Sequence, residues 1–362
     1  MSESPANDDE TRQKLLEISE VLKKEGIEVE TCDDIHTLLN NITRSFCSKA
    51  GEELFKNGIT DLSRKIDEYH SQLYGFEERV CYRWSLPFSL FEYLIIQSQE
   101  INEEFHKEFG KIATEERDLV FGILFRLHEK ACIVAKEVIA LMKSGYSDGA
   151  NARCRTLYEF AVISFFIAKH GNDVAERYIN YQAIEEYRAA KEYQEYCKIT
   201  GDIPFSNEEM EKMNEKCETL IEQYKKPFTK RTFNKGYGWA AKALNLPNPK
   251  FSDLARDVDF SRLLFPYSMA SWAIHANAKC LMFKLASPDE KYILTGESNI
   301  GMAEPGQRAA ISLLQINFAL LNSKISIENL TRIRSMILLV NEINKAFSEV
   351  HDSINMNEVR IS

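Results

Sequence analysis

Apolar residues recur at the three- and four-residue spacing of amphipathic helices over most of the chain. The longest such stripe opens at Thr114 and runs to Gly145. Further helices are expected over about 11–24, 33–49, 51–74, 91–109, 150–170, 173–198, 210–224, 260–286, 306–324 and 328–353. The pattern therefore predicts an all-α fold, a multi-helix bundle.

Interruptions of this pattern predict the domain organisation. Residues 1–10 are polar and acidic and are expected to form a disordered tip, followed by a smaller helical N-terminal subdomain over 11–110. The aromatic segment Arg79–Leu90 contains Pro87, which predicts a connector. The main bundle is expected over 111–355, with residues 173–226 forming a projecting helical hairpin.

Composition agrees with a helical class and locates the charge. The chain has only 15 Gly and 9 Pro in 362 residues, too few turn residues for an all-β sandwich. Its net charge is −10, and residues 1–110 hold 23 acids against 12 bases, whereas the remainder holds 32 against 33. The acidic N-terminal third is therefore a candidate surface for a protein partner, and the overall charge does not favour nucleic acid.

The absence of membrane, secretion and cofactor motifs in the sequence bears on the expected compartment and cofactors. No apolar run reaches about 18 residues and the start is no secretory signal, which predicts a cytoplasmic protein without membrane contact. The eight scattered cysteines predict reduced thiols. No P-loop, GxGxxG, HExxH or GxSxG motif occurs, so we expect neither a metal nor a nucleotide cofactor; the oligomeric state stays open.

Two apolar segments each contain isolated polar groups. Glu159 is the only charge between Thr156 and Ala168, and Arg155 precedes it by four residues. The uncharged segment from Leu263 to Ala278 contains His275, which shares a helix face with Tyr267 and Ser271 at a spacing of four. Because buried polar groups need partners, we expect both segments to be buried and their polar groups to meet in one pocket, with Asn277 nearby.

This pocket has two interpretations. It is either a structural network that fixes the register of two helices, or a site for a ligand or a reaction. In the second, His275 is the acid or base, Glu159 orients it, and Arg155 holds an anion such as phosphate. Arg177 and Tyr181 follow closely enough in sequence to reach the same pocket as ligand-binding residues.

The segments that carry these residues resemble a bacterial all-helical family of unknown function. The shared pattern is Gly-Tyr and a small residue before Arg-x-Leu-x-Glu, then a later Tyr-x3-Ser-x3-His. The matching positions are Gly145, Tyr146, Ala150, Arg155, Leu157, Glu159, Tyr267, Ser271 and His275. The resemblance covers about Leu119 to Lys284 and implies no activity.

More remotely, a helical bundle with inward Arg and His is similar to the HEPN superfamily, which includes metal-independent ribonucleases. Their signature is Arg-x4–6-His on one helix, which here fits only Arg64 and His70, and His275 has no Arg at that spacing. The sequence departs from the superfamily at this signature.

The basic and aromatic segment 225–239 is a second candidate site. Lys226, Lys230, Arg231, Lys235 and Trp239 could hold a nucleic acid through backbone charge and base stacking, although loop aromatics more often anchor a loop to the protein body.

Two functions from different classes follow. The first is a metal-independent ribonuclease or phosphodiesterase of a phage-defence or toxin type. The second is a non-enzymatic ligand-sensing or protein-interaction module, in which the polar cluster is structural or binds an anion. Whether the protein is an enzyme is left open, and RNA or a small anionic ligand is the expected partner.

Overall fold

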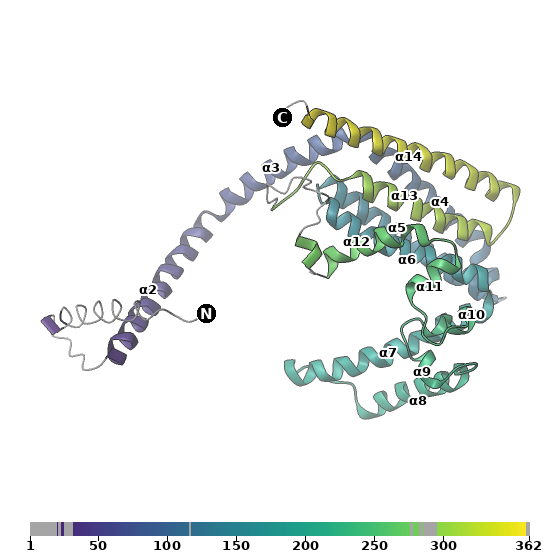
Figure 1. Ribbon diagram of the computed structural model, residues 1–362, viewed down its shortest axis with the longest axis horizontal. Coiled ribbons are helices and arrows are strands. Elements are labelled where there is room, and N and C mark those ends of the chain that lie inside the picture. Colours follow the sequence, from purple (N-terminus) through teal and green to yellow (C-terminus); the bar gives the residue numbers. More distant parts are fainter. Residues whose placement is uncertain are drawn as a thin grey trace. The chain divides into compact units, whose positions relative to one another are not determined.

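The computed structural model describes residues 20, 23–24, 32–115, 117–275, 278–281, 285 and 295–359, and within these ranges it contains helices and no strand. The predicted all-α fold is confirmed (Figure 1). The helices are α2 (Cys32–Thr60), α3 (Leu62–Arg83), α4 (Ser85–Glu115), α5 (Leu119–Lys143), α6 (Ser147–His170), α7 (Asn172–Thr200), α8 (Asn207–Tyr224), α9 (Lys230–Phe233), α10 (Ala241–Leu244), α11 (Phe251–Asp257), α12 (Leu264–Ile274), α13 (Ala303–Asn322) and α14 (Ile327–Val359). None of the helices described here is long and apolar enough to cross a bilayer.

The chain divides into two compact units, Met1–Gly75 and Phe76–Ser362, and α3 crosses their boundary. The expected helix over 11–24 lies almost wholly outside the described residues. In the first unit, large apolar side chains such as Phe46, Leu54 and Phe55 are exposed.

The second unit begins well before the predicted boundary at residue 110. Phe88, Phe91 and Leu94 on α4 are almost fully buried in its core. These positions recur every three or four residues and form the inner face of an amphipathic helix. Helix α4 therefore packs as part of the main bundle, in the compact unit that begins at Phe76.

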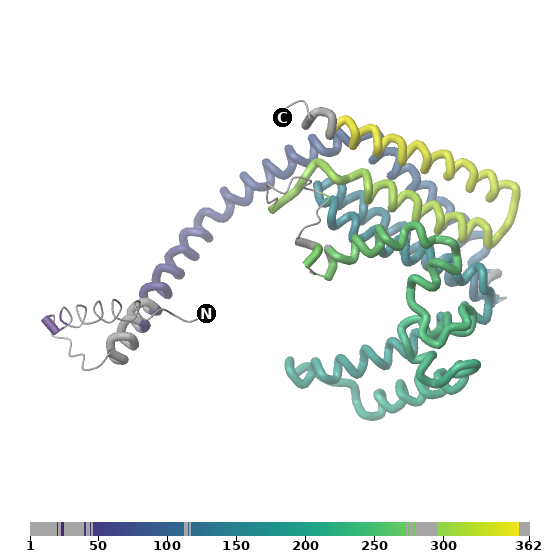
Figure 2. Tube along the Cα trace, viewed as in Figure 1, coloured from purple at the N-terminus to yellow at the C-terminus, as the bar shows by residue number. Residues whose placement is uncertain are grey.

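Five long helices form the main core of this unit. Helices α5 and α6 lie side by side, and α13 packs against both, while α14 packs against α13 and α4. The tube in Figure 2 follows the C-terminal helices α13 and α14 back alongside α4 and α5. The core thus joins the C-terminal helices α13 and α14 to α4, α5 and α6, which lie far from them in sequence.

A second cluster of buried residues lies where α6 meets α7, α8, α11 and the turn of 3₁₀ helix η1 (Gly238–Ala240). Helices α7 and α8 pack together as the expected hairpin. The connecting loop ends in Ser206, whose hydroxyl accepts from the backbone N–H of Glu209 while the Glu209 carboxylate accepts from the Ser206 N–H. This capping box fixes the start of α8.

Two expected boundaries differ from the structure. The predicted connector Arg79–Leu90 is almost entirely helical, because α4 begins at Ser85 and Pro87 lies in its first turn, where a missing N–H costs little. The helix expected over 260–286 is much shorter: α12 ends at Ile274, and His275 is its C-cap.

Candidate functional site

Arg155, Glu159 and Tyr267 form a closed hydrogen-bonded triad between α6 and α12. Arg155 Nε donates to Glu159 Oε1 over 3.2 Å, and Arg155 Nη2 donates to the Tyr267 hydroxyl over 3.1 Å. That hydroxyl in turn donates to Glu159 Oε1 over 2.7 Å. Arg155 and Glu159 are 24% and 29% exposed, so the triad is at the edge of the core rather than inside it. It connects two segments more than a hundred residues apart.

Aromatic packing fixes the ring of Tyr267. The ring stacks on Phe251 with centroids 4.8 Å apart, contacts Tyr158 at 5.6 Å, and has the Arg155 guanidinium 4.8 Å from its centroid. Burial, followed by the hydrogen bond to the Glu159 carboxylate, raises the pKa of Tyr267 well above its usual value. Tyr267 therefore keeps its proton at neutral pH and acts here as a hydrogen-bond donor.

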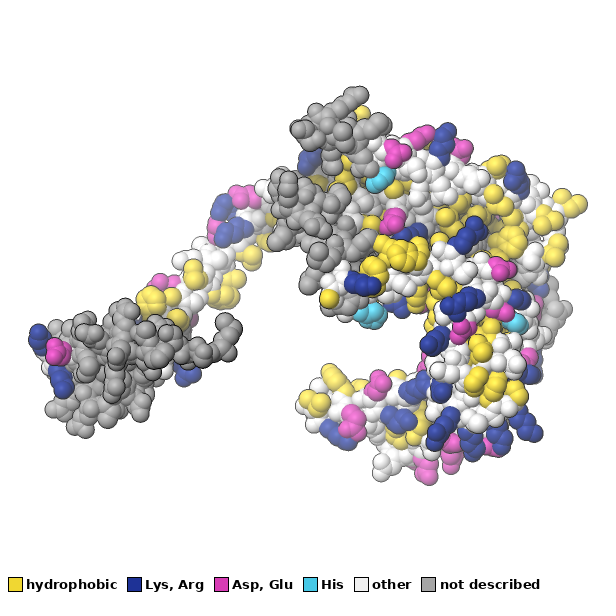
Figure 3. Space-filling view, in the orientation of Figure 1, with side chains coloured by type: hydrophobic (Ala, Val, Ile, Leu, Met, Phe, Trp, Pro, Cys, Tyr) yellow, Lys and Arg dark blue, Asp and Glu magenta, His cyan; other side chains and the backbone are white. Residues whose placement is uncertain are grey.

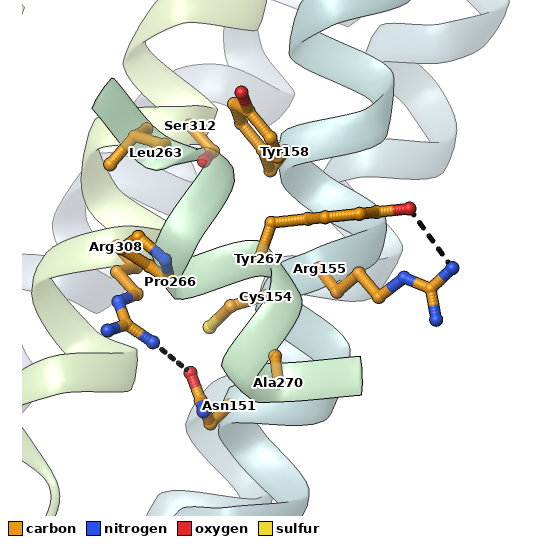
Figure 4. A pocket seen from close by; sticks show the side chains of 10 residues that line it. All are labelled: Asn151, Cys154, Arg155, Tyr158, Leu263, Pro266, Tyr267, Ala270, Arg308 and Ser312. Atoms are coloured by element: carbon orange, nitrogen blue, oxygen red, sulfur yellow. Dashed lines mark hydrogen bonds between the residues drawn. The ribbon is translucent and has the colours of Figure 1, made fainter. Parts of the chain in front are cut away.

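The cavity beside the triad is too small for an organic ligand. It lies between α6, α12 and α13 (Figure 4) and has a volume of about 20 Å³, room for about one water molecule. Arg308, on its far wall, donates to Asn151 Oδ1 over 2.7 Å and to Glu304 over 2.6 Å. Burial raises the pKa of the nearby Cys154 thiol to about 12, so this thiol is no nucleophile at neutral pH. These contacts make the region a structural junction.

The residues predicted on the second helix do not complete the site. His275 is exposed at the end of α12, two helical turns beyond Tyr267, or about 12 Å along the axis. Among the described residues, Glu159 bonds to Arg155 and Tyr267 and not to His275. The Ser271 hydroxyl donates to the Tyr267 backbone oxygen of its own helix over 2.9 Å. Asn277 lies outside the described residues.

The expected burial of His275 is therefore wrong. An uncharged sequence does not guarantee burial: Phe265 and Ile274 on the same helix are 67% and 48% exposed. Helix α12 is covered by α6 around Tyr267 and Ala270, and this cover ends before the helix does.

A much larger cleft opens between α5, α6, α7 and the turn Gly236–Trp239. Its volume is about 650 Å³, within the range of small-molecule sites in proteins. Its apolar wall comes from Ile123, Leu127 and Ile163, and its aromatic lining from Tyr178, Tyr181, Tyr237 and Trp239. Arg126 and Lys130 from α5 and Gln182 and Glu185 from α7 complete it.

Tyr237 brings the cleft close to the triad. The ring centroid of Tyr237, which lines the cleft, lies 6.2 Å from that of Phe251, and Phe251 stacks on Tyr267 of the triad. Burial, and after it the negative charge of Glu159, raises the pKa of Tyr237 to about 12. The triad thus supports the wall of the cleft without opening into a comparable cavity of its own.

Of the two predicted ligand-binding residues on α7, only Tyr181 reaches this cleft. Its hydroxyl donates to the Lys235 backbone oxygen over 2.5 Å, so the ring is the part of Tyr181 that contributes to the lining of the cleft. Arg177 is buried, pairs with Asp173 at 3.1 Å, and lies 4.6 Å from the ring centroid of Tyr224 on α8. Arg177 therefore holds the hairpin together.

The basic and aromatic segment is divided between core and surface. Trp239 is only 3% exposed and packs against Phe166 and Tyr178, so its expected role in stacking on bases is wrong. Its partners are buried aromatics, as is usual for a ring that anchors a loop. Lys226, Lys230, Arg231 and Lys235 are exposed.

The charge around this segment is mixed. Lys230 pairs with Glu222 at 2.9 Å, and Figure 3 shows acidic side chains among the Lys and Arg side chains of this end of the molecule. Such a surface lacks the continuous positive potential that a nucleic-acid backbone requires.

Sequence reasoning missed a buried polar network around His128. The His128 Nε2–H donates to Asn317 Oδ1 over 2.8 Å, since an amide oxygen can only accept, and Nδ1 accepts from Asn102 over 3.2 Å. Asn317 also donates to Ser98 over 2.8 Å. This network joins α4, α5 and α13 in the centre of the core, and the signal for it was an asparagine within the apolar sequence of α13.

Sequence reasoning also missed two residues of the larger cleft, Arg126 and Lys130, although their spacing is visible in the sequence. Arg126 and Lys130 are four residues apart on α5 and therefore project from one face of the helix. Only the position of α7 shows that this face borders a cleft and not bulk solvent.

A comparison with models of protein families gave a match. Residues 121–292 match the model of a family of unknown function (DUF5677). The predicted resemblance of this region to a helical family without assigned activity is confirmed to that extent. The matched residues include the triad and every residue that lines the larger cleft. No curated protein and no solved structure gave a match.

Proposed function

We propose that this protein is a non-enzymatic ligand-binding module that holds a small organic anion in the cleft between α5, α6 and α7. The observation that carries the proposal is the contrast in size: the cleft measures about 650 Å³, whereas the cavity at the triad measures about 20 Å³. A drug-sized molecule fits only the first.

The charges at the cleft support an anionic ligand. Arg126 and Lys130 are exposed, and neither makes an ion pair or side-chain hydrogen bond with another described residue. Two adjacent cations above an aromatic and aliphatic lining provide both charge neutralisation and apolar contact for such a molecule.

The ribonuclease hypothesis has less support. It requires His275 to act beside Arg155 and Glu159, but His275 is at the exposed end of α12, and Arg155 is already bonded to Glu159 and Tyr267. Cleavage of RNA in the presence of EDTA by the wild type, and its loss in His275→Ala, would favour this hypothesis over ours.

Ligand-dependent thermal stability tests the proposal. We expect at least one member of a panel of aromatic and aliphatic carboxylates and phosphates to raise the unfolding temperature, by about 5 °C at a hundred times its Kd. The shift should disappear in the double variant Arg126→Gln/Lys130→Gln. It should persist in Lys111→Gln/Lys136→Gln, which removes two exposed charges elsewhere. If no compound stabilises the wild type, the proposal is wrong.

A further inference from the structure

Three neighbouring aromatic rings, those of Tyr178, Tyr237 and Trp239, line the cleft. Trp239 is buried, and its ring is nearly perpendicular to that of Tyr178, with centroids 4.9 Å apart at 75°. Tyr237 lies 6.4 Å from Trp239, centroid to centroid, and both tyrosines are only partly buried. Part of their ring surface therefore faces the open space of the cleft, where a planar ligand can stack.

The cleft is electrically asymmetric. Arg126 and Lys130 stand on the α5 side, and Glu185 with Gln182 stand on the α7 side. Glu185 lines the cleft together with Tyr178 and Tyr181. Burial raises the pKa of both tyrosines, and the negative charge of Glu185 adds to this effect. A ligand in the cleft thus meets cations at one side and an acceptor at the other.

These opposite charges do not neutralise one another. Although Arg126, Lys130 and Glu185 line the same cleft, no ion pair forms between them in the described part of the chain. Each charge is therefore available to a ligand that spans the space between them.

We propose that the ligand is a nucleoside monophosphate. Its base would stack against Tyr178 and Tyr237, its phosphate would bind Arg126 and Lys130, and an N–H group of the base would donate to Glu185. This inference rests on the proposed ligand-binding function and adds the ligand class. Arginine binds phosphate through paired N–H donors, and a carboxylate accepts from the amino group of a base.

An aromatic carboxylate, like a nucleotide, has an aromatic ring and an anionic group. It offers no N–H donor for the Glu185 carboxylate, which would therefore make no hydrogen bond with such a ligand. The acidic residue on the α7 side is the observation that favours the base of a nucleotide over a plain aromatic ring.

Calorimetric titration of the full chain tests the ligand class. The probes are the four common 5′-mononucleotides, the corresponding nucleosides, ribose 5-phosphate and phenylacetate. We expect at least one mononucleotide to bind at least about tenfold more tightly than its nucleoside, ribose 5-phosphate or phenylacetate, because only the mononucleotide engages both sides of the cleft.

Variants of exposed residues assign the contacts without disturbing the core. Arg126→Gln/Lys130→Gln should weaken the nucleotide at least about tenfold and leave the nucleoside unchanged. Glu185→Gln should weaken nucleotide and nucleoside alike and leave ribose 5-phosphate unchanged. Glu192→Gln, an exposed acid further along α7, is the matched control and should change nothing.

Each alternative outcome is distinguishable. If a carboxylate binds and every mononucleotide has a Kd above about 1 mM, the ligand class is wrong and the proposed function stands. If mononucleotides bind with unchanged affinity in the Arg126 and Lys130 variant, the site is elsewhere and the inference is overturned. If none of the anions binds, this inference fails together with the proposed function.

Discussion

Tyr267 holds α12 against α6 through one hydroxyl. That hydroxyl accepts from Arg155 and donates to Glu159, and its ring packs on Phe251 and Tyr158. The aromatic packing and the hydrogen bonds are separable, because phenylalanine keeps the first and removes the second.

Tyr267→Phe should lower the free energy of unfolding by about 1 kcal/mol. The loss is modest because Arg155 and Glu159 keep their mutual bond and are partly exposed to water. Urea denaturation measures it. Tyr82→Phe is the control, since Tyr82 is 87% exposed and should show no change. Equal stability of Tyr267→Phe and the wild type would show that the triad contributes nothing to the α6–α12 contact.

His128 is the second residue whose chemistry depends on its surroundings. Burial lowers the pKa of His128 to about 4, and the hydrogen bond with Asn317 opposes part of this shift. The folded pKa lies below the unfolded value of about 6.5. As pH falls from about 6.5 to 4, the unfolded state takes up a proton that the folded state refuses, so stability is lost across this window and is fully present above it.

The difference in stability between the wild type and His128→Gln should depend on pH because of this proton uptake. We expect the stability difference between wild type and variant to become less favourable to the wild type by about 3 kcal/mol between pH 7 and pH 4, because only the wild type contains the suppressed imidazole. Chemical denaturation across this range provides the measurement. A difference that stays constant with pH would contradict the burial-lowered pKa.

Among the elements, α13 depends on a glycine where it packs against Phe347 of α14. A Cβ built on Gly306 would lie 2.2 Å from Cζ of Phe347. Phe347 is fully buried and packs on Trp84 and Phe88, so its ring cannot move aside. Close packing of α13 and α14 therefore requires glycine here.

Gly306→Ala should destabilise the protein by about 1–3 kcal/mol through overpacking. Gly122→Ala on α5 is the matched control, because nothing lies within 4 Å of its added Cβ and alanine favours a helix by about 0.5–1 kcal/mol. Thermal or urea unfolding of both variants tests the contrast. Variants with the same sign of effect would contradict the α13–α14 contact described here.

The helix boundaries show where tertiary contacts, and not the local sequence pattern, decide the extent of a helix. The periodicity of α5, α6, α13 and α14 predicts these helices because each has a buried face of its own. Helix α12 is apolar almost all round, so its sequence contains no information about which face is covered or where cover ends. A proline is expected to interrupt a helix unless it lies in the first turn. The sequence alone did not show that Pro87 lies in the first turn of α4, so it predicted a connector there.

At the scale of the whole molecule, the hydrophobic core belongs to the unit Phe76–Ser362. Every buried apolar residue of the described chain, from Val80 onward, lies in this unit. Burial of apolar surface is the main source of folding free energy. Among the residues before Phe76 whose burial the structure describes, none is buried.

A chain that begins at Phe76 should therefore fold on its own. We expect it to unfold in one cooperative transition with a midpoint within a few degrees of that of the full chain, since its core is intact. Circular dichroism and calorimetry compare the two. Loss of the transition would mean that residues before Phe76 supply part of the stability.

The sequence alone determined the helical class, most helix positions and the polar character of Arg155, Glu159 and Tyr267, because helical periodicity and isolated polar residues are local properties. The tertiary structure decided which groups meet. Glu159 bonds to Tyr267, 108 residues away, and not to His275, because α6 covers α12 around Tyr267 and this cover ends before His275, the exposed C-cap of the helix. The cleft lined by Arg126, Lys130 and Glu185 likewise exists only through the placement of α7 beside α5, which no local pattern specifies.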